Sequence, residues 1–356
     1  MVTLDVLPSG SDQTDMNTMN ESGPAIGRYL YRTHETGEGQ AAISIIDLKT
    51  GQTSIHEGRQ FGGWSRLDGI EWTPWGTLLV GEESGAFGRL FECKVNGMEL
   101  SCVDRPQLGR MSHEGIAVTE EGNVFVVDEY DGGSIYKFVP DEYGRLASGQ
   151  LFALQVLSDE VTVCSERTGV GYTPTGQAQW IPLIPGRDGV VTDPTYDARS
   201  AASEAQATDF CRPEDLEIIG DNVYVSTTTT NTVFQIPINT DSPVITEYAG
   251  INTNMSPEDV EPDYGLRNPD NLASDHSGNL YIVEDNDGRS DIWIASPDHN
   301  RDGVADSVFL FATLTTYGAE ATGIYIAPVD PPGMFLNVQH AYDGNDMTLL
   351  IIPSPK

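Results

Sequence analysis

His113-Glu114-Gly115-Ile116, followed by the turn residue Gly122 and the apolar run Val124-Phe125-Val126, is one copy of the repeat that decides the fold. Three further copies have a carboxylate at the same second position: Leu67-Asp68-Gly69-Ile70, Pro213-Glu214-Asp215-Leu216 and Pro269-Asp270-Asn271-Leu272. A degraded fifth copy is Ala321-Thr322-Gly323-Ile324, with Glu320 just before it. A repeat that keeps an acid at the start of its first strand can place several carboxylates in one spot.

The spacing of these acids predicts the architecture. From Asp68 to Glu320, successive acids are 46, 100, 56 and 50 residues apart. A period of about 40–50 residues is typical of the blades of a β-propeller, and the interval of 100 fits two blades, one of which has lost the repeat. Residues 123–127, a turn at 131–133 and residues 134–139 read as strand, turn and strand. The sequence therefore predicts an all-β fold, a β-propeller of about six blades with an irregular insertion.

The same reading divides the chain. Residues 1–24 are polar and are predicted to be a disordered lead-in, and residues 25–356 are predicted to form a single propeller domain. The hairpin that begins at 42–47 is expected to complete the last blade and close the ring. Residues 141–208 break the blade pattern, and the part from 165 to 207 is rich in Thr, Pro, Gly and Ala. We interpret this segment as an insertion over one face of the propeller.

Charge and composition exclude several classes of partner. The chain has 54 Asp and Glu against 19 Lys and Arg, a formal charge of -35. Such a surface repels the phosphates of nucleic acid and of anionic membranes, and no run of 18 apolar residues is present. Most of this acid is expected to form a solvated, salt-tolerant surface. We expect no nucleic-acid partner, no membrane partner and a monomer.

Four cysteines, Cys93, Cys102, Cys164 and Cys211, bear on the compartment. None has the spacing of a metal site. Cys93 and Cys102 flank Val95-Asn96-Gly97-Met98, a strong hairpin signal, and are expected to lie close across two paired strands. Cys164 and Cys211 bracket a long irregular stretch. Two disulfides would indicate an oxidising compartment, and the alternative is four buried free thiols.

The repeated acids are the first candidate site. The innermost strand of each propeller blade lines the central channel, so Asp68, Glu114, Glu214 and Asp270 should converge at one channel mouth, with Glu320 as a fifth. Converging carboxylates repel one another unless cations lie between them. Oxygen ligands favour Ca²⁺ over zinc or copper. The alternative is a set of turn acids that face water.

A second candidate is a local loop. Asp298, Asn300, Asp302 and Asp306 occupy positions 1, 3, 5 and 9 of a segment with Gly303 at position 6, as at the front of a calcium loop. Position 12 is Phe309 instead of the Glu of an EF-hand. We predict a structural calcium site here, with a plain Asp/Asn/Gly turn as the alternative.

Arg212 is the third candidate, because it lies two residues from Glu214. Alternation along an extended segment lets both side chains face the same side. A planar guanidinium beside bound cations can hold a phosphate or carboxylate bidentately. Arg212 and Glu214 are the predicted catalytic pair, although Arg212 on its own also suits a salt-bridge partner of the repeated acids.

Seven short stretches between residues 73 and 340 resemble the PhoX-type alkaline phosphatase family of β-propellers. They are Thr73-Pro74-Trp75-Gly76-Thr77-Leu78-Leu79-Val80-Gly81-Glu82-Glu83, Ser112-His113-Glu114-Gly115, Phe138-Val139-Pro140, Arg212-Pro213-Glu214, Pro269-Asp270-Asn271-Leu272, Glu320-Ala321-Thr322-Gly323 and Val338-Gln339-His340. The resemblance implies hydrolysis of phosphomonoesters by a cluster of iron and calcium ions in a periplasmic or secreted protein.

The resemblance also implies roles for single residues. Metals would be held by Glu83, Glu114, Glu214 and Asp270. Further candidate ligands are Glu82, which adjoins Glu83, and the repeated acids Asp68 and Glu320. Arg212 would hold the phosphate, and His340, in the last matching stretch, is a candidate substrate-binding residue.

The chain departs from the family pattern at Gly81. In the family the Thr-Pro-Trp-Gly stretch runs into Cys-Glu-Glu, and that thiolate binds iron. Here the soft ligand is absent, which puts iron and manganese in doubt and leaves calcium as the expected cofactor. The predicted function is a metal-dependent phosphoesterase, a phosphoric ester hydrolase acting on a small phosphorylated or anionic substrate. The alternatives are a non-catalytic propeller that binds metal and an anion, and a calcium-dependent lactonase.

Overall fold

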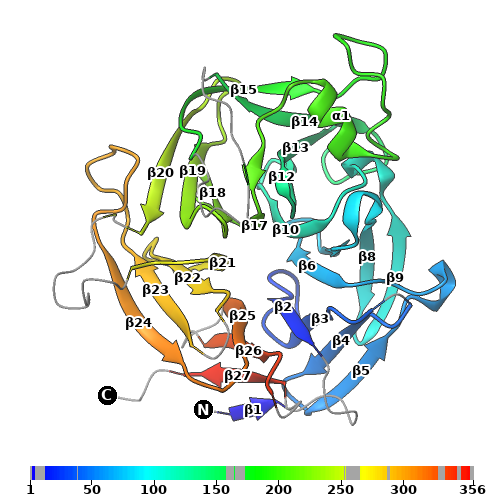
Figure 1. Cartoon of the computed structure of the whole chain (residues 1–356). Helices are drawn as coiled ribbons and strands as arrows, with labels where there is room; N and C mark the ends of the chain where they lie inside the picture. Colours follow the sequence, from blue (N-terminus) through cyan, green and yellow to red (C-terminus); the bar gives the residue numbers. More distant parts are fainter. Residues whose placement is uncertain are drawn as a thin grey trace.

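The strands surround a central channel in the computed structural model, which describes residues 2–4, 13–37, 39–157, 164, 173–251, 253, 265–286, 289–327, 333–342 and 346–352. Within these residues six sets of four antiparallel strands follow one another around the ring (Figure 1). In each set the first strand lies innermost, at β2, β6, β10, β17, β21 and β25. The predicted all-β propeller fold is confirmed.

The first three blades come in chain order. Blade 1 is β2 (Thr14–Met19), β3 (Tyr29–His34), β4 (Ala42–Asp47) and β5 (Gln52–His56). Blade 2 is β6 (Leu67–Trp72), β7 (Thr77–Glu82), β8 (Leu90–Asn96) and β9 (Glu99–Asp104). Blade 3 is β10 (His113–Val118), β11 (Val124–Asp128), β13 (Ile135–Pro140) and β14 (Gly149–Val156).

The remaining blades complete the ring. Blade 4 is β17 (Pro213–Ile219), β18 (Asn222–Thr227), β19 (Thr232–Pro237) and β20 (Val244–Gly250). Blade 5 is β21 (Pro269–Ser274), β22 (Leu280–Glu284), β23 (Ser290–Ala295) and β24 (Val308–Leu314). Blade 6 is β25 (Glu320–Ile326), β26 (Met334–Gln339), β27 (Met347–Ile351) and β1 (Val2–Leu4).

The core lies between the blades. Strands such as β7 and β11 are buried along their whole length because a neighbouring blade covers each face. Phe125 of blade 3, for example, shares a cluster with Leu216 and Phe234 of blade 4. The outermost strand β5, in contrast, has no fully buried residue. The continuous apolar runs after each acid are therefore the middle strands of stacked blades.

The ring is closed by the N-terminal segment. β1 pairs antiparallel with β27, as its position beside the red strand in Figure 1 shows. The prediction that the hairpin at 42–47 completes the last blade was wrong, because β4 pairs with β3 and β5 of its own blade. β1 thus supplies the fourth strand of the last blade and joins the start of the chain to its end.

The predicted disordered lead-in over residues 1–24 is wrong for β2, which is a fully buried innermost strand. Its residues are mostly polar, and they are satisfied by neighbours instead of by apolar packing. Thr33 Oγ1 accepts from Met16 N at 3.0 Å, and Asn17 Nδ2 donates to the Gly323 carbonyl of blade 6. A polar strand of this kind carries no hydrophobic alternation. Residues 1 and 5–12 lie outside the described residues.

The interval of 100 residues holds one blade and an insertion, so the prediction of two blades there was wrong. β14 falls inside the predicted insertion 141–208, yet it is the outer strand of blade 3. β15 (Gly176–Pro182) extends β14 and also pairs with β20, which links blades 3 and 4. The insertion also contains a short helix, α1 (Ala198–Glu204), capped by Asp197 through Ser200 N.

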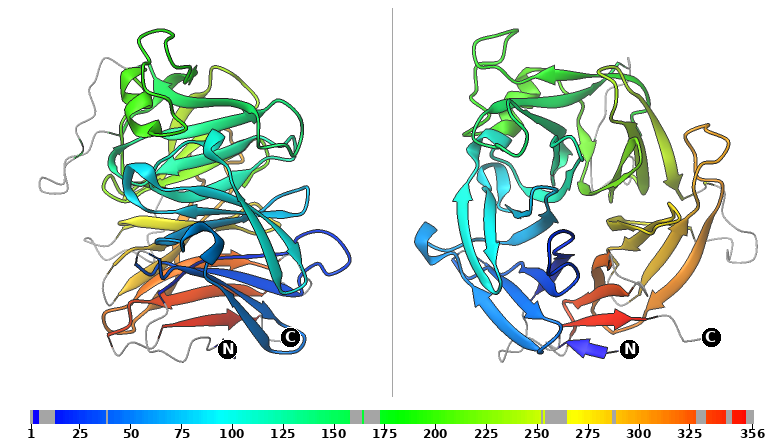
Figure 2. Two further views of the ribbon diagram at one scale, coloured as in Figure 1. Left: turned by 90° about the vertical axis from the view of Figure 1, so that its right-hand side faces the viewer. Right: turned by 180° about the vertical axis from the view of Figure 1, so that it is seen from behind.

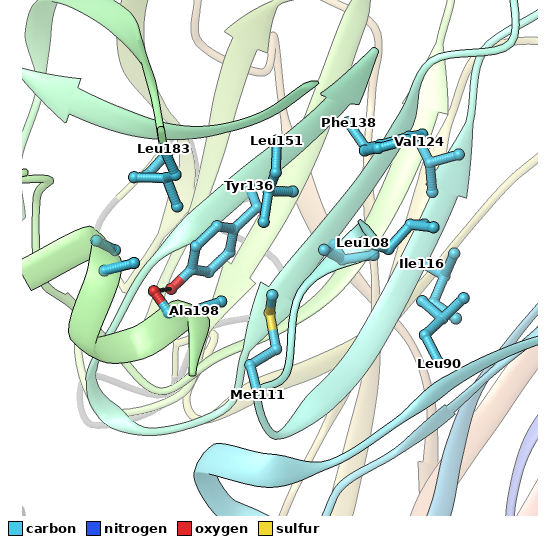
Figure 3. Packing of buried hydrophobic residues seen from close by; sticks show 14 of the residues in the cluster. Leu90, Leu108, Met111, Ile116, Val124, Tyr136, Phe138, Leu151, Leu183 and Ala198 are labelled. Atoms are coloured by element: carbon cyan, nitrogen blue, oxygen red, sulfur yellow. Dashed lines mark hydrogen bonds between the residues drawn. The ribbon is translucent and has the colours of Figure 1, made fainter. Parts of the chain in front are cut away.

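The described part of the insertion packs on blade 3 (Figure 3). Tyr136 of β13 donates from its hydroxyl to the Ala198 carbonyl at 3.3 Å, and Leu183, Met111 and Leu151 surround the ring. α1 lies at one face of the ring in the side view of Figure 2. An insertion over one face stays a prediction for the segment as a whole.

Short elements and two disulfides fix the connections. β12 (Asp131–Gly133) pairs with β16 (Phe210–Cys211), and the 3-10 helices are η1 (Arg59–Phe61), η2 (Gly85–Phe87) and η3 (Pro106–Leu108). Disulfides join Cys93 to Cys102, across β8 and β9, and Cys164 to Cys211. Both predicted pairs are thus formed, and such pairing fits an oxidising compartment. Among the described residues, no helix has the length and apolar character to cross a membrane.

Candidate metal centre

Each repeated acid lies in a β-bulge. In β6, Leu67 pairs with Glu82 and Ile70 pairs with Val80, so Asp68 and Gly69 together oppose one residue of β7. The same shift occurs at the acids of β2, β10, β17 and β21. A bulge leaves one residue out of the ladder and re-aims its side chain. The bulge thus explains how the acid departs from the ladder at the same point in five blades.

The residue after each acid explains the rest of the repeat. A Cβ on Gly69 would lie 1.7 Å from the Glu114 carbonyl oxygen, and one on Gly115 would lie 2.5 Å from Asp215 Cα. In blade 4 the position is Asp215, whose Oδ2 accepts from Leu272 N of blade 5 at 2.8 Å. Neighbouring innermost strands are therefore in contact at the bulge. The contact is made by a glycine packed against backbone, or by a carboxylate that accepts a backbone N–H.

Two tiers of functional groups result. The inner acids are the residues in the bulges, all buried: Asp15, Asp68, Glu114, Glu214 and Asp270. The second tier follows the end of the second strand of each blade: Glu35, Glu83, Glu129, Thr228, Asp285 and His340. In five blades the backbone N–H of this second-tier residue donates, at 2.8–3.0 Å, to the carbonyl two residues before the inner acid. The repeat therefore fixes both tiers by one backbone contact.

The tiers bring carboxylates together in two places. Asp15, Glu35 and Asp68 offer oxygens that all lie within 4.8 Å of one another, and so do Glu114, Glu129 and Glu214. We call these groups the first trio and the second trio. Each combines inner acids from two adjacent blades with one second-tier acid. The sequence predicted Asp68, Glu114 and Glu214 but missed the other three.

The donor set fits a hard divalent cation. Both trios offer carboxylate oxygens, which Ca²⁺ prefers. Asp68 is 3% exposed, and its Oδ1 has no hydrogen-bond partner. An unpaired buried carboxylate oxygen is costly, so it normally has a cation or a proton as partner. The residues of either trio could therefore hold a divalent cation.

Electrostatics lead to the same conclusion. Burial, and then the neighbouring acids, raise the pKa of Asp68 and of Glu114 well above the usual carboxyl range. Burial and repulsion from Glu129 raise the pKa of Glu83 to about 10. Carboxyls in such a group retain protons unless a cation compensates their charge. Cation binding would displace these protons and lower the pKa values.

Arg212 lies beside the second trio. Its guanidinium contacts Glu129 at 2.9 Å, Glu214 at 3.1 Å and Asp285 at 3.6 Å. Its backbone is left-handed, with φ 50°, and its N–H donates to the Tyr130 carbonyl at 3.2 Å. The side chain remains 29% exposed, so part of it is accessible beside these three acids. The predicted proximity of Arg212 to Glu214 is thus found.

Arg66 is the matching residue at the first trio. It also precedes its inner acid by two residues, with φ 47°, and it pairs with Glu35 at 2.7 Å and with Glu83. Arg66 was not predicted from the sequence, although its position two residues before Asp68 matches that of Arg212 before Glu214. The ring therefore carries two arginines in equivalent positions.

Glu320 differs from the inner acids. It pairs opposite Gln339, and the bulge of β25 lies further along, between Thr322 and Tyr325. Its carboxylate accepts from His340 Nδ1 at 2.7 Å. This contact, chiefly, raises the pKa of His340 to about 9, while burial raises that of Glu320 to about 7. The predicted ligand Glu320 and the predicted substrate residue His340 thus form an ion pair beside the acids.

Glu82 and Asp270 lie outside both trios. Glu82 ends β7 and faces away from Glu83, because side chains alternate along a strand. Its carboxylate accepts from Arg89 Nε at 2.7 Å and from Ser65 N at 3.0 Å. Asp270 remains an inner acid, and its Oδ1 accepts from Asn271 Nδ2 at 3.0 Å. The predicted metal role of Glu82 is not supported by its position.

The profile of the alkaline phosphatase PhoX family matches residues 57–342. The chain belongs to the PhoX alkaline phosphatase family. A search of curated protein sequences gave no significant match.

Solved structures similar to this PhoX-family chain show its fold. A catalytically inactive virginiamycin B lyase from Staphylococcus aureus matches over 99% of both chains, with 12% identity and a TM-score of 0.53. A luciferin-regenerating enzyme matches over 99% of this chain and 97% of its own, with 9% identity and a TM-score of 0.52. At these identities the similarity concerns the fold alone.

Gly81 is the position where the resemblance implied a thiolate in the family. A Cβ on Gly81 would lie 2.6 Å from His113 Cβ of the next blade. His113 is fully buried, and its Nε2 lies 3.1 Å from the Gly109 carbonyl oxygen. The space that a longer side chain at position 81 would need is therefore closed. The packing here is built for glycine and adds no soft ligand to the trios.

The Asp and Asn side chains of the predicted calcium loop accept hydrogen bonds from within the loop itself. Asp298 Oδ2 accepts from Gly303 N at 2.7 Å, Asn300 Oδ1 from Asp302 N at 2.9 Å, and Asp306 Oδ2 from His299 Nδ1 at 2.8 Å. Such bonds are typical of an Asp/Asn turn. A calcium ion at this loop stays a prediction.

Proposed function

We propose that this PhoX-family protein hydrolyses phosphate esters at the two carboxylate trios, with Arg212 holding the phosphoryl group. The observation that carries the proposal is the position of Arg212, whose guanidinium contacts two members of the second trio and whose side chain is partly exposed. A phosphate bound there would meet both the guanidinium and the cations held by the trio. Few other ligands need both at once.

The chain's own groups have distinct parts in this proposal. The Arg212 fork binds two phosphoryl oxygens and compensates the charge that develops on them. Thr228 donates to Glu214, and Glu129 contacts the Arg212 Nε, so both acids are fixed while the phosphate binds. Bound cations would polarise the phosphoryl oxygens and lower the pKa of a coordinated water. Calcium is the proposed cofactor because every ligand is oxygen.

The setting of the reaction follows from the same features. Two disulfides and the strong negative charge favour a periplasmic or secreted enzyme. The negative surface favours small phosphorylated substrates over nucleic acid. We propose that the protein acts as a monomer.

Phosphate release tests the proposal. Purified protein is assayed with aryl phosphates at alkaline pH in calcium, manganese or iron, and its metal content is measured in parallel. We expect calcium-dependent release that falls in Arg212→Ala and Glu214→Gln, with less bound calcium in Glu214→Gln. Arg28→Ala, which removes an ion pair with Asp47 in blade 1, is the control.

Two other results would have clear meanings. Absence of release under all these metals and alkaline pH values would exclude the phosphoesterase. If calcium and phosphate still bound, the non-catalytic binding propeller would take its place, and a parallel screen with lactones would test the lactonase. Variants that keep full calcium content, anion binding and activity would exclude the trios as the site.

A further inference from the structure

A cavity of about 420 Å³ lies at the opposite end of the channel from the inner acids. Its walls are the second halves of the innermost strands and the turns after them, such as Glu71 of β6, Glu217 of β17 and Ser274 of β21. None of the five inner acids lines it. We call this space the far cavity and the end with the inner acids the acid mouth.

An apolar layer separates the far cavity from the acid mouth. Each innermost strand contributes one residue just past its acid or, in blade 6, near its bulge: Met16, Ile70, Ile116, Leu216, Leu272 and Ile324. All six are buried and line the cavity. A ligand of the far cavity would therefore meet a dry apolar floor and polar walls.

The polar walls are strongly acidic. Eight carboxylates line the cavity, and its lining contains no Lys or Arg. Glu217 accepts from Ser274 Oγ at 2.6 Å, and Glu21 accepts from the Tyr325 hydroxyl at 2.6 Å. Burial, and then its neighbours Glu21 and Glu217, raise the pKa of Glu71. Apart from His276, the lining therefore supplies hydrogen-bond donors but no basic side chain to compensate these acids.

Asn17 supplies an independent observation. It lines the cavity and is only 5% exposed. Its Nδ2 donates to the Gly323 carbonyl, while its Oδ1 has no hydrogen-bond partner. A buried amide oxygen normally accepts a hydrogen bond. The residues that form the wall thus include one unsatisfied acceptor.

We propose that the far cavity binds a small organic cation, an aliphatic amine in its ammonium form. Ammonium groups would pair with Glu71 and Glu217 and donate to Asn17, and the alkyl chain would lie on the apolar layer. The volume suits a small molecule, since ligand pockets are commonly about 300–1,000 Å³. This proposal is independent of phosphate ester hydrolysis.

A hard metal ion fits the far cavity less well. Calcium takes about six to eight oxygens at short distance. In the part of the chain that the structure describes, the carboxylate trios within 4.8 Å are both at the acid mouth. The acids of the far cavity are spread around its walls, and its floor is apolar, so an extended cation with an alkyl part suits it better.

The test is calorimetric titration of 1,4-diaminobutane into the calcium-loaded protein. We expect saturable binding that weakens at least about ten-fold in Glu71→Gln and in Glu217→Gln, because a hydrogen bond to a charged group contributes about 1.5–3 kcal/mol. Glu99→Gln, an exposed acid on the outer strand β9, is the matched control and should bind as the parent does.

A second variant guards against misfolding as an explanation. Glu217→Lys places an ammonium group in the cavity and should abolish amine binding while keeping the parent's circular dichroism and phosphate release. The proposal is overturned if diaminobutane gives no saturable heat, if both Gln variants bind as the parent does, or if additional calcium competes with the amine for the same site. A failure of phosphate release alone would leave the proposal standing.

Discussion

The two ends of the channel use the same six strands and carry opposite combinations of polar groups. At the acid mouth, bulges draw carboxylates into trios within 4.8 Å, and Arg66 and Arg212 accompany them. In the far cavity, carboxylates are spread around an apolar floor with no Lys or Arg in the lining. The same excess of acid therefore favours compact cations plus an anion at one end and an extended cation at the other.

This difference arises from backbone geometry more than from composition. In five innermost strands the bulge lies beside the inner acid, and past it the regular ladder resumes in β6 and β21. A regular strand alternates its side chains between the two faces of its sheet, whereas a bulge re-aims one of them. A charge count alone would not distinguish the two ends.

Loss of Arg212 should have the largest effect and should be confined to the acid mouth. Arg212→Ala is expected to lower kcat/KM for aryl phosphates about 10²–10³-fold, because it removes a fixed donor to the developing charge. Steady-state kinetics with Arg28→Ala as control measure this. Diaminobutane binding should be unchanged, and a loss of both activities would contradict the separation of the two ends.

Removal of calcium should have the next largest effect. Metals bind the native state, so each site occupied at about 100 times its Kd contributes about 2.7 kcal/mol of stability. We expect a chelator to lower the melting temperature of the parent and of Glu217→Gln alike, measured by calorimetry. The loss should be smaller in Asp68→Asn, because one trio is incomplete. An unchanged melt on chelation would remove the metal argument.

The pH dependence of the calcium-free protein should have an unusual sign. Carboxyls with raised pKa values, such as Glu83 at about 10 and Glu217 at about 8, hold more protons in the folded than in the unfolded state. Stability is then greatest near the unfolded carboxyl pKa, about 4–5, and falls as pH rises toward these values.

Bound calcium should weaken this pH dependence of stability. Urea unfolding from about pH 5 to about pH 8 should show decreasing stability without calcium and a weaker slope with it, because bound calcium lowers the pKa values at the acid mouth. The slope that remains should decrease in Glu217→Gln. Rising stability of the calcium-free protein over this range would contradict the raised carboxyl pKa values on which this prediction rests.

Gly81→Cys should have the smallest effect of the four. Its Cβ would contact His113 Cβ, so we expect a loss of about 1–3 kcal/mol in the free energy of unfolding, as for other overpacked sites. Urea denaturation measures this, and iron content is measured alongside. A stable variant that binds iron would show that His113 can move and that the glycine is a simple substitution.

Much of the fold could be predicted from the sequence because the repeat is both periodic and chemically marked. The acid, the turn glycine and the apolar run identified the innermost and middle strands of four blades. Blade 1 was missed because Asn17 stands two residues past Asp15, where the other four copies have Ile or Leu, and because the partners of β2 are polar. A strand held by polar contacts cannot be found by hydrophobic alternation.

The candidate site was only half predictable for a related reason. The inner acids recur at a fixed place in the repeat, but Glu35 and Glu129 come after the second strand, where nothing in the local pattern marks them. Their backbone N–H groups bond to Gln13 and Ser112, and this contact exists only when the blade is folded. The sequence also predicted a metal role for Glu82 because it adjoins Glu83. Strand alternation sends the two side chains to different sides, so Glu82 pairs with Arg89 and Glu83 with Arg66.

The Cys164–Cys211 disulfide links the proposed activity to the oxidation state of the protein. Cys211 is joined to Arg212 by a peptide bond, and its partner lies in the insertion 47 residues earlier. Arg212, which we propose to hold the phosphate, is therefore next to a bond that forms only under oxidising conditions. A chain still in a reducing compartment would have its blades but a less firmly held Arg212. Phosphate release that is equal before and after mild reduction would show that this anchoring is dispensable.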